Sequence, residues 1–517
     1  MTQGIVDHNT LRLAVEGYPR RQSYEPGDTV EVCCSSRAAR FGATVVRVGA
    51  SRVPVWHEAD IVGAERVVPP DASVNGCDWP VTFTIPVDPE WRSGFYEVEL
   101  RAHGVDGPEA MSHTFFVVRA APGAAAPALL VLATNTYNAY NMWGGTCLYR
   151  GATTLSFQRP IDRGFVTRPD AGYDGRNASI DPAGDPTHRH LLDYLQLHRY
   201  PLWCVSSGWH NWERRFAHWA ETAGFAVDFA VSSDLENRPE IVDSYALVLS
   251  VGHDEYWSWE MRDCIDAYVA AGGNHAIFSG NTCFWQVRLT NDGQTMTCFK
   301  GQVSSDPVLG TGDDRLRTSF WSDPAIGRPE TYTTGLTFTR GGYARVGAAT
   351  PRSSGAFTVQ RPDHWAFAGT DLRYGDALGL GSYIVGYEVD GCEMRLEHGL
   401  PVPTGGDGAP LDMEILATAP ARLLSQTQTA SEIPHALWAD PTGPGDLESL
   451  AVGLFGSDAP EHTRRIAHGA AVIGCFRRGK GTVFHAGTTD WAYGLDADPL
   501  VQQVTANVLR RLTPEDG

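Results

Sequence analysis

Short β-rich segments alternate with turn residues along roughly the first quarter of the chain. Apolar and β-branched residues dominate these segments, and turn sequences such as EPGD and PPD divide them. The segments are 11–18, 29–36, 42–49, 79–86, 94–102 and 112–120. Many short strands separated by turns are typical of an antiparallel sandwich. We therefore expect residues 1–121 to form an immunoglobulin-like β-sandwich, which ends at the small-residue linker AAPGAAAPA.

After the linker, apolar segments alternate with helical patterns. The expected strands are 129–135, 200–207, 225–233, 245–252 and 275–281. Between them, large apolar residues recur at three- and four-residue steps over 209–219 and 261–269, as on one face of a helix. Continuous apolar strands with crossover helices indicate a parallel sheet that is covered on both faces. Residues 122–517 are therefore expected to form an α/β domain resembling class I glutamine amidotransferases, with a β-rich insertion around 295–480.

Composition narrows the class of protein. The 517 residues are 42% hydrophobic, which is enough for two or three domains, and no apolar run reaches membrane-spanning length. The net charge of −20 disfavours nucleic acid, anionic membrane and anionic substrates, and it suits a small neutral or cationic molecule. The ten cysteines show no C-x-x-C or zinc spacing, and the first residues show no secretory signal. We expect buried thiols and a cytoplasmic protein.

Polar residues follow the expected parallel strands, at the edge of the sheet where ligands bind. They include Asn135–Tyr137, Ser206–Ser207, Ser232–Asp234, His253–Glu255 and Asn281. Capping of the next helix accounts for Ser232–Asp234. Three ionisable groups in a row at His253–Glu255 exceed what capping needs, so we expect a functional site there.

Several familiar chemistries are disfavoured. An amidotransferase nucleophile needs a cysteine on a tight G-x-C-x-G turn, whereas Cys283 comes two residues late and bulky side chains follow it. The chain has no G-x-S-x-G elbow, Walker loop, G-x-G-x-x-G after the first α/β strand, or H-E-x-x-H. Zinc held by imidazoles is therefore not expected.

Tyrosines stand in several of the same loops. They lie in TNTYNAYNMWGG (134–145), PDAGYDGR (169–176) and GHDEYW (252–257). Phenolate and carboxylate oxygens are hard donors that suit a highly charged cation such as ferric iron. The alternative is that the first of these tyrosines pack against Trp143 and form local hydrogen bonds. Spacing alone leaves both readings open.

Four motifs together carry a resemblance to a known family. They are TNTYNAYNMWGG, the run GHDEYW…FWQVR (252–288), YIVGYEVDG (383–391) and FHAGTTDWAYGL (484–495). In this combination the chain resembles the large (catalytic) subunit of N,N-dimethylformamidase over most of residues 125–515. That family hydrolyses N,N-dimethylformamide to dimethylamine and formate at a mononuclear iron held by two tyrosines and one glutamate.

The resemblance implies a set of metal ligands in this chain. Glu255 of GHDEYW matches the glutamate ligand. One tyrosine ligand is Tyr137, with Tyr140 as the alternative, and the other is Tyr173. One ferric ion per chain is the implied cofactor.

The resemblance also implies residues for the chemistry beside the metal. His253 matches a histidine next to the metal, Asn281 a nearby polar group, and Glu388 a second carboxylate. His253 or Glu388 would move a proton from water to the leaving nitrogen, and Asn281 would stabilise the oxyanion. Trp143, Trp257 and Phe284 are candidates for lining an apolar pocket.

The expected function is hydrolysis of a small neutral N-substituted amide. The expected partners are further copies of the chain, and the resemblance allows a small subunit as well. The alternatives are a sugar-directed, ThuA-like enzyme, a carbohydrate-binding protein without catalysis, and a relative that has lost its metal.

Overall fold

The structure is a computed structural model, which describes residues 12–168, 176, 189–345, 354–426 and 445–513. The predicted ligand Tyr173 lies outside the described residues. All ten cysteines are described; they are free and buried, as predicted. No helix in the described ranges is long and apolar enough to cross a membrane.

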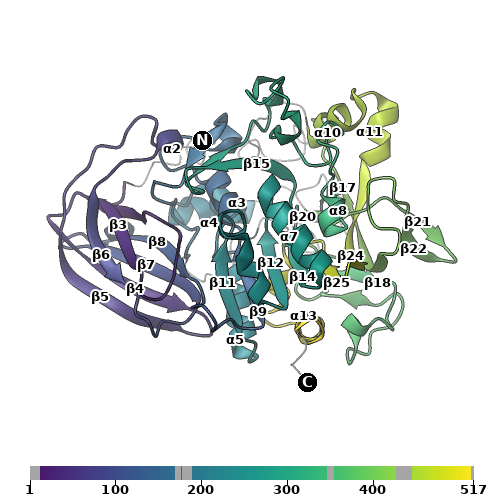
Figure 1. Ribbon diagram of the computed structural model, residues 1–517, viewed down its shortest axis with the longest axis horizontal. Coiled ribbons are helices and arrows are strands. Elements are labelled where there is room, and N and C mark those ends of the chain that lie inside the picture. The colour runs from purple at the N-terminus through teal and green to yellow at the C-terminus, as the bar shows by residue number, and fades with distance from the viewer. Residues whose placement is uncertain (1–11, 169–175, 177–188, 346–353, 427–444, 514–517) are drawn as a thin grey trace.

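The N-terminal part consists of two facing sheets (Figure 1). One has the order β1-β3-β6 and the other β2-β8-β7-β4-β5. Their bounds are Val15–Pro19 (β1), Ser23–Tyr24 (β2), Thr29–Ser36 (β3), Arg40–Val48 (β4), Arg52–Val62 (β5), Val81–Pro86 (β6), Gly94–Ala102 (β7) and Met111–Val118 (β8). Every pair is antiparallel except β2 with β8. The name immunoglobulin-like stays a prediction.

Alternation along β7 explains how these sheets pack on the rest of the molecule. Tyr96, Val98 and Leu100 enter the core between the two sheets. Phe95 points the other way and stacks on Trp209, with ring centroids 4.1 Å apart. Part of the outer face of the second sheet, on β4, β7 and β8, is therefore buried against the α/β part, whereas β5 is largely exposed.

An eleven-stranded mixed sheet forms the centre of the molecule. Its main order is β11-β9-β12-β14-β25-β24-β23-β17-β20, and β18 and β19 lie off this path. The strands β11, β9, β12, β14 and β25 pair in parallel, and the remaining pairs are antiparallel. The bounds are Ala128–Leu132 (β9), Val227–Val231 (β11), Leu247–His253 (β12), Asn274–Gly280 (β14), Thr337–Tyr343 (β17), Phe357–Val359 (β18), Ala377–Leu378 (β19), Glu388–Gly391 (β20), Glu414–Arg422 (β23), His468–Arg478 (β24) and Gly481–His485 (β25).

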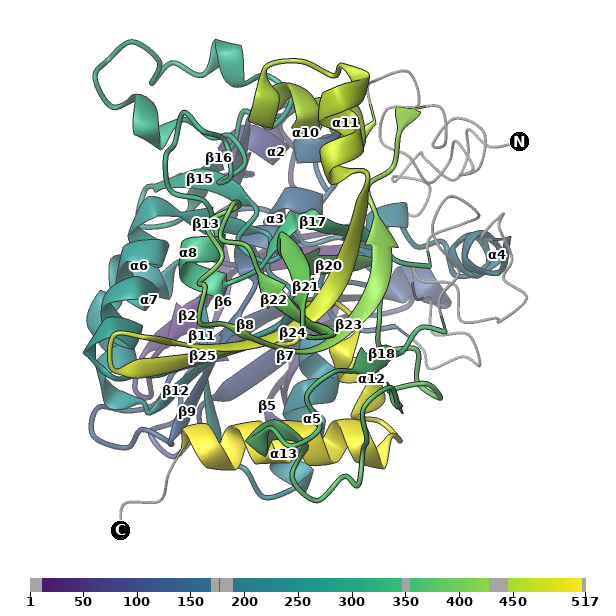
Figure 2. The same ribbon diagram turned by 90° about the vertical axis from the view of Figure 1, so that its right-hand side faces the viewer.

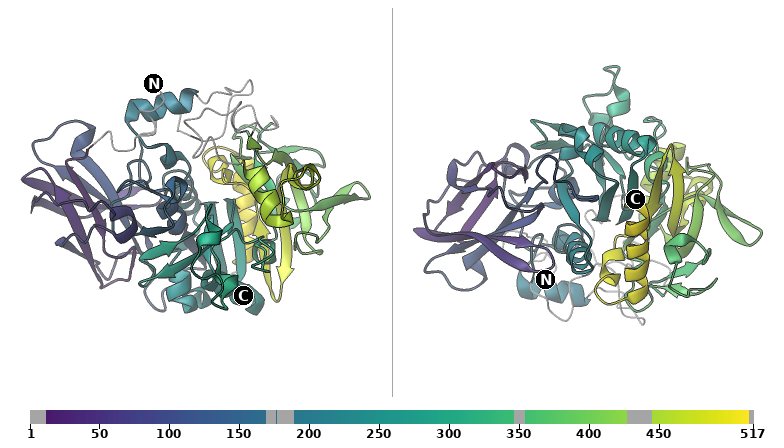
Figure 3. Two further views of the ribbon diagram at one scale, coloured as in Figure 1. Left: turned by 90° about the horizontal axis from the view of Figure 1, so that it is seen from above. Right: turned by 60° about the horizontal axis from the view of Figure 1, so that its bottom comes forward.

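The region 295–480, expected as a β-rich insertion, thus supplies several strands of the central sheet itself. Figure 3 shows these green and yellow strands at the end of the molecule opposite the β-sandwich. The name amidotransferase-like stays a prediction for the whole α/β part.

Helices cover both faces of the sheet. Alternate residues of β9 enter two different cores on opposite faces of the sheet. Leu130 packs in one core with α5 (Glu213–Thr222) and α13 (Pro499–Leu512), and Leu129 packs in the other with α7 (Trp259–Ala271). Ser258 caps α7 by accepting a hydrogen bond from the amide of Met261. Figure 2 shows α13 running along one edge of the molecule.

The smaller elements surround this frame. They are α2 (Ala72–Asn75), α3 (Thr134–Tyr140), α4 (Arg189–His198), α6 (Asp234–Asn237), α8 (Thr331–Thr334), α10 (Asp446–Phe455), α11 (Pro460–Ile466), α12 (Trp491–Gly494), the sheet β10-β16-β15-β13 (Thr154–Ser156, Thr295–Thr297, Trp285–Thr290, Tyr256–Ser258) and the hairpin β21-β22 (Met394–Glu397, Leu400–Pro403).

One expected strand was wrong. Residues 200–207 contain the 3-10 helix η3, Leu202–Val205, which follows Pro201 and is buried throughout. A short apolar run predicts burial but does not distinguish a strand from a helical turn. The correction matters because the segment after η3 carries Ser206 into the candidate site.

Candidate active site

The carboxyl ends of neighbouring parallel strands bring the predicted polar residues together. β12 ends at His253, and Glu255 follows in the short connection to β13. The backbone amide of Glu255 donates to Thr136 Oγ1 over 3.0 Å, which fixes this connection against α3, the helix that follows β9. The site is therefore built on the rigid edge of the sheet.

Two phenols converge on the carboxylate of Glu255. The hydroxyl of Tyr140, the last residue of α3, donates to Oε2 over 3.0 Å. The hydroxyl of Tyr149, from the 3-10 helix Leu148–Arg150, lies 3.1 Å from both carboxylate oxygens and also contacts the Tyr140 hydroxyl. Trp203 packs against both phenol rings, with centroid distances of 5.8 and 5.1 Å. Three oxygen-bearing side chains from separate segments thus meet at one buried point.

A lysine completes this side of the site. Lys300 Nζ lies 3.5 Å from Glu255 Oε1 and 3.0 Å from the hydroxyl of Tyr256, and it stands 3.5 Å above the ring of Tyr149. The Tyr256 hydroxyl donates in turn to that of Tyr149 over 3.0 Å. An ammonium group therefore faces the carboxylate from the side of β13.

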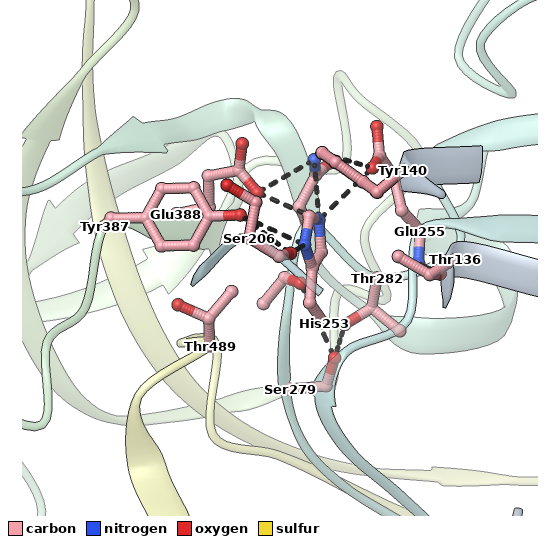
Figure 4. Close-up of polar contacts among 12 residues, drawn as sticks. Thr136, Tyr140, Ser206, His253, Glu255, Ser279, Thr282, Tyr387, Glu388 and Thr489 are labelled. Atoms are coloured by element: carbon pink, nitrogen blue, oxygen red, sulfur yellow. Dashed lines mark hydrogen bonds and ion pairs between the residues drawn. The ribbon is translucent and has the colours of Figure 1, made fainter. Parts of the chain in front are cut away.

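His253 stands between two carboxylates, as Figure 4 shows. Its Nε2 lies 2.9 Å from Glu388 Oε2 and 3.3 Å from Glu255 Oε2. Its Nδ1 lies 2.8 Å from the carbonyl oxygen of Ser206 and 3.1 Å from the hydroxyl of Tyr387. The Ser206 carbonyl accepts a hydrogen bond from Nδ1–H, which orients Nε2 toward the carboxylates.

Asn281 links the far side of the site. It follows β14, and its Nδ2 lies 3.3 Å from Glu388 Oε2 and 3.4 Å from His253 Nε2. Its Oδ1 is buried and has no hydrogen-bond partner among the described residues. Asn281, His253 and Glu388 therefore form one cluster.

Charge within the cluster sets its protonation states. Burial alone would raise the pKa of Glu255, but the ammonium of Lys300 and the hydrogen bond from His253 lower it to about 2. Burial lowers the pKa of His253, yet the charge of Glu388 and the contact with Glu255 bring it well above the usual value. Burial, and then the charge of Glu255, raise the pKa values of Tyr140 and Tyr149. Glu255 is therefore an anion that both neutral phenols face.

The structure distinguishes the two tyrosines of TYNAY. The hydroxyl of Tyr137 donates to Glu213 Oε1 over 2.7 Å, and its ring packs edge-on against Phe115 of the sandwich. Tyr140, not Tyr137, is hydrogen-bonded to Glu255. The preference for Tyr137 is therefore corrected, because its hydroxyl is directed to a different carboxylate. The other expected ligand, Tyr173, lies outside the described residues.

The three aromatic residues expected in the pocket lie in other clusters. Trp143 donates to Glu16 and packs edge-on against Trp79. Trp257 belongs to the core beneath α7, and Phe284 stacks on Phe320. The aromatic ring that packs on the two phenols is Trp203 instead.

Cys283 is buried, and burial raises the pKa of its thiol. A thiol of this kind is not an activated nucleophile, as the sequence also indicated.

Residues that sequence reasoning missed come from irregular segments. The sequence did not single out Tyr149, Lys300 or Tyr387 as a ligand or a catalytic group, although Tyr387 lies within the motif YIVGYEVDG. Tyr149 follows TYNAY by nine residues, and Tyr387 precedes Glu388 directly, so their neighbourhood was a signal. Nothing in the spacing pointed to Lys300.

A separate carboxylate cluster lies on the sandwich. Among the described residues, Glu97, Glu99 and His113 bring ligand atoms within 4.8 Å of one another. Arg52 already forms ion pairs with both glutamates. The two glutamates thus share the guanidinium of Arg52, and we assign no cation to this cluster.

Comparison with known proteins shows which family this chain matches. A profile of the family described as N,N-dimethylformamidase beta subunit-like, C-terminal, matches residues 42–506. The chain is 23% identical over 482 residues to the N,N-dimethylformamidase beta subunit of Alcaligenes sp, covering 86% of this chain and 55% of that protein. It is 24% identical over 359 residues to the protein of the same name from Paracoccus aminophilus, covering 62% and 43%. The chain spans about half the length of the curated relatives it matches.

Among solved structures, domain 1 of VCBP3 from Branchiostoma floridae matches 22% of this chain and 98% of its own, at 16% identity and a TM-score of 0.15. A score this low carries no argument about fold.

Proposed function

The chain belongs to the N,N-dimethylformamidase beta subunit-like family, and from this premise we propose that it hydrolyses the carbon–nitrogen bond of small N-substituted amides. We propose that it is the catalytic, large subunit of such an enzyme. The observation that carries the proposal is the meeting of Tyr140, Tyr149 and Glu255 beside His253 and Glu388.

The donor set fits a hard trivalent cation. Tyr140, Tyr149 and Glu255 offer three oxygens that carry up to three negative charges once both phenols are ionised. The phenols now donate hydrogen bonds to Glu255, so a cation that replaces their two protons would occupy a site where the oxygens already converge. Tyr140, Tyr149 and Glu255 are therefore the residues proposed to hold one ferric ion.

The second phenol has two candidates. Tyr149 is proposed from its contacts with Glu255, and Tyr173 from the family resemblance. Iron content decides between them: the tyrosine whose substitution removes the iron is the second ligand.

A cation held here would supply Lewis-acid chemistry, polarising an amide carbonyl and lowering the pKa of a water molecule. The remaining work falls to side chains of this chain. Hydrolysis adds the water oxygen to the carbonyl carbon, breaks the carbon–nitrogen bond and gives a carboxylic acid and an amine. One water proton must reach the leaving nitrogen, because an amide anion is a very poor leaving group.

His253 and Glu388 are the residues proposed to move that proton. Nε2 of His253 and Oε2 of Glu388 are 2.9 Å apart, within the range of direct transfer. The Ser206 carbonyl holds the other ring nitrogen, so the imidazole keeps its orientation while the proton moves. Asn281 Nδ2 is the proposed donor to the developing oxyanion, a role typically worth about 2.7–4 kcal/mol.

The substrate is proposed to be small and neutral. Trp203 and the phenol rings give the site an apolar wall that suits N-alkyl groups. The net charge of −20 disfavours anionic substrates. Further copies of the chain and a small subunit are proposed partners, and the cytoplasm is the proposed location.

The test combines metal content with an amide screen. The protein as purified is expected to contain about one iron per chain, with the charge-transfer colour of tyrosinate bound to ferric iron. It is expected to release amine from N,N-dimethylformamide or a close analogue. A sugar-binding protein or a metal-free relative would show neither the colour nor the amine.

A further inference from the structure

The turn that presents Asn281 is tied to the strand that carries Glu388. Asp390 lies two residues after Glu388 on β20 and is completely buried. Its Oδ2 accepts a hydrogen bond from the backbone amide of Thr282 over 3.0 Å. His485, at the end of β25, brings its Nε2 within 3.3 Å of the same oxygen. Neither Asp390 nor His485 has a part in the chemistry proposed above.

The turn needs such support because its backbone is unusual. Asn281 has a φ of 51° and Cys283 a φ of 55°, which place two non-glycine residues in the left-handed region. Gly280, just before them, is so close to β20 that an added Cβ would lie 2.6 Å from the carbonyl oxygen of Glu388. A backbone held in this conformation persists only where the surrounding contacts determine it.

The contacts around the turn form two parallel links to β20. Asn281 Nδ2 faces Glu388 Oε2 at 3.3 Å, and the next residue, Thr282, donates its amide to Asp390. The Thr282 hydroxyl donates to Ser279 Oγ over 3.1 Å and lies 3.5 Å from His485 Nε2. The second link therefore fixes the position from which Asn281 reaches Glu388 and His253.

Stability alone does not explain an aspartate at this position. Asp390 Oδ1 is buried without a hydrogen-bond partner among the described residues. A carboxylate with one unsatisfied oxygen in the core lowers stability relative to a fully satisfied group. Its other oxygen, Oδ2, nevertheless accepts a hydrogen bond from the amide of Thr282, the residue directly after Asn281.

We propose that Asp390 is a positioning residue that holds Asn281 in place beside Glu388 and His253. Asp390 is in turn held by His485. His485 Nδ1 lies 3.0 Å from the carbonyl oxygen of Thr334, so this ring is anchored from both sides. The inference rests on the proposed function, because Asn281 is taken there as the donor to the oxyanion. Without Asp390, the turn relaxes and the Asn281 amide moves away from the reacting atoms.

The test compares Asp390→Ala with Asp390→Asn and with a matched control, Asp228→Ala. Asp228 is also buried and also accepts a backbone amide, that of Ala126 at 2.7 Å, but it lies on the edge strand β11. We expect Asp390→Ala to lower kcat about 10- to 100-fold, since a displacement of about 1 Å at a catalytic group costs about that much. KM should stay within about threefold and the charge-transfer band should not change.

The asparagine variant and the control separate positioning from folding. Asp390→Asn keeps an oxygen that accepts from Thr282, so it should recover most of kcat. Asp228→Ala should lower the melting temperature and leave kcat per folded enzyme unchanged. A wild-type value of kcat per folded Asp390→Ala enzyme would overturn the inference, and so would losses of activity and iron that follow the folded fraction alone.

Amide hydrogen exchange over residues 280–285 gives a readout that needs no substrate. Asp390→Ala should exchange faster there than wild type, and Asp390→Asn and Asp228→Ala should not. Unchanged exchange in Asp390→Ala would contradict the inference on its own. A wild-type protein that hydrolyses no amide contradicts the proposed function instead, and the exchange result still decides whether Asp390 holds the turn.

Discussion

Removing single phenol oxygens around Glu255 tests the site at its centre. Tyr140→Phe and Tyr149→Phe each delete a hydroxyl that lies 3.0 or 3.1 Å from the Glu255 carboxylate and leave the ring in place. Tyr137→Phe is the matched control, because its buried hydroxyl contacts Glu213 at 2.7 Å instead. Each of the three variants loses one hydroxyl group that contacts a buried glutamate side chain.

The expected magnitudes differ between stability and metal binding. A hydrogen bond to a charged group contributes about 1.5–3 kcal/mol, so Tyr140→Phe and Tyr149→Phe should each lower the free energy of unfolding by about that amount. Tyr137 contacts Glu213, whose pKa burial raises to about 8, so Tyr137→Phe should lower it by only about 0.5–1.5 kcal/mol. Only Tyr140→Phe and Tyr149→Phe also remove a proposed ligand. Loss of a metal-orienting group lowers metal affinity about 10- to 100-fold, and loss of a direct ligand should exceed that range.

The assay is iron titration followed by absorbance, with thermal unfolding measured in parallel. Tyr140→Phe should bind iron at least about 100-fold more weakly and lose most of the charge-transfer band. Tyr137→Phe should keep both. Iron lost in Tyr137→Phe and retained in Tyr140→Phe would refute the assignment made from the contacts. Tyr173→Phe belongs in the same series, because loss of the band there and not in Tyr149→Phe would identify Tyr173 as the second phenol.

Three further predictions concern individual side chains. Glu255→Ala should lose iron and activity together, whereas His253→Ala should keep iron and lose about 10²–10⁴-fold in kcat; full activity in Glu255→Ala would exclude it as a ligand. Asn281→Ala should lower kcat about 10²–10³-fold with iron content unchanged, and an effect on KM alone would show that it only binds substrate. Burial raises the pKa of Glu213 to about 8 from 4.5, so between these pH values the folded chain keeps a proton that the unfolded chain releases. Unfolding free energy should therefore fall with rising pH by up to about 1.4 kcal/mol per pH unit, and Glu213→Gln should show a shallower fall in urea titrations; equal slopes would contradict the shift.

Part of the site could be predicted from the sequence because a parallel sheet imposes its own geometry. His253 and Asn281 follow adjacent parallel strands, so they had to meet at one edge of the sheet. Glu388 came from the family resemblance, because its strand β20 lies at the far end of an antiparallel stretch that the pattern did not resolve.

Other residues could not be placed from the sequence. Tyr137 and Tyr140 are three residues apart on α3, and which of them reaches Glu255 depends on how this short helix sits between sandwich and sheet. Tyr149 and Lys300 lie in a 3-10 turn and a loop, where no periodicity fixes the direction of a side chain. Long-range packing, not local pattern, decides such positions.

The most direct test of the central claim is the iron content and visible spectrum of the purified chain beside those of Glu255→Ala. We expect about one iron per chain with a tyrosinate charge-transfer band, and both should be lost in the variant. A chain that binds no iron yet hydrolyses amides at full rate, or whose band survives the loss of Glu255, would contradict the central claim.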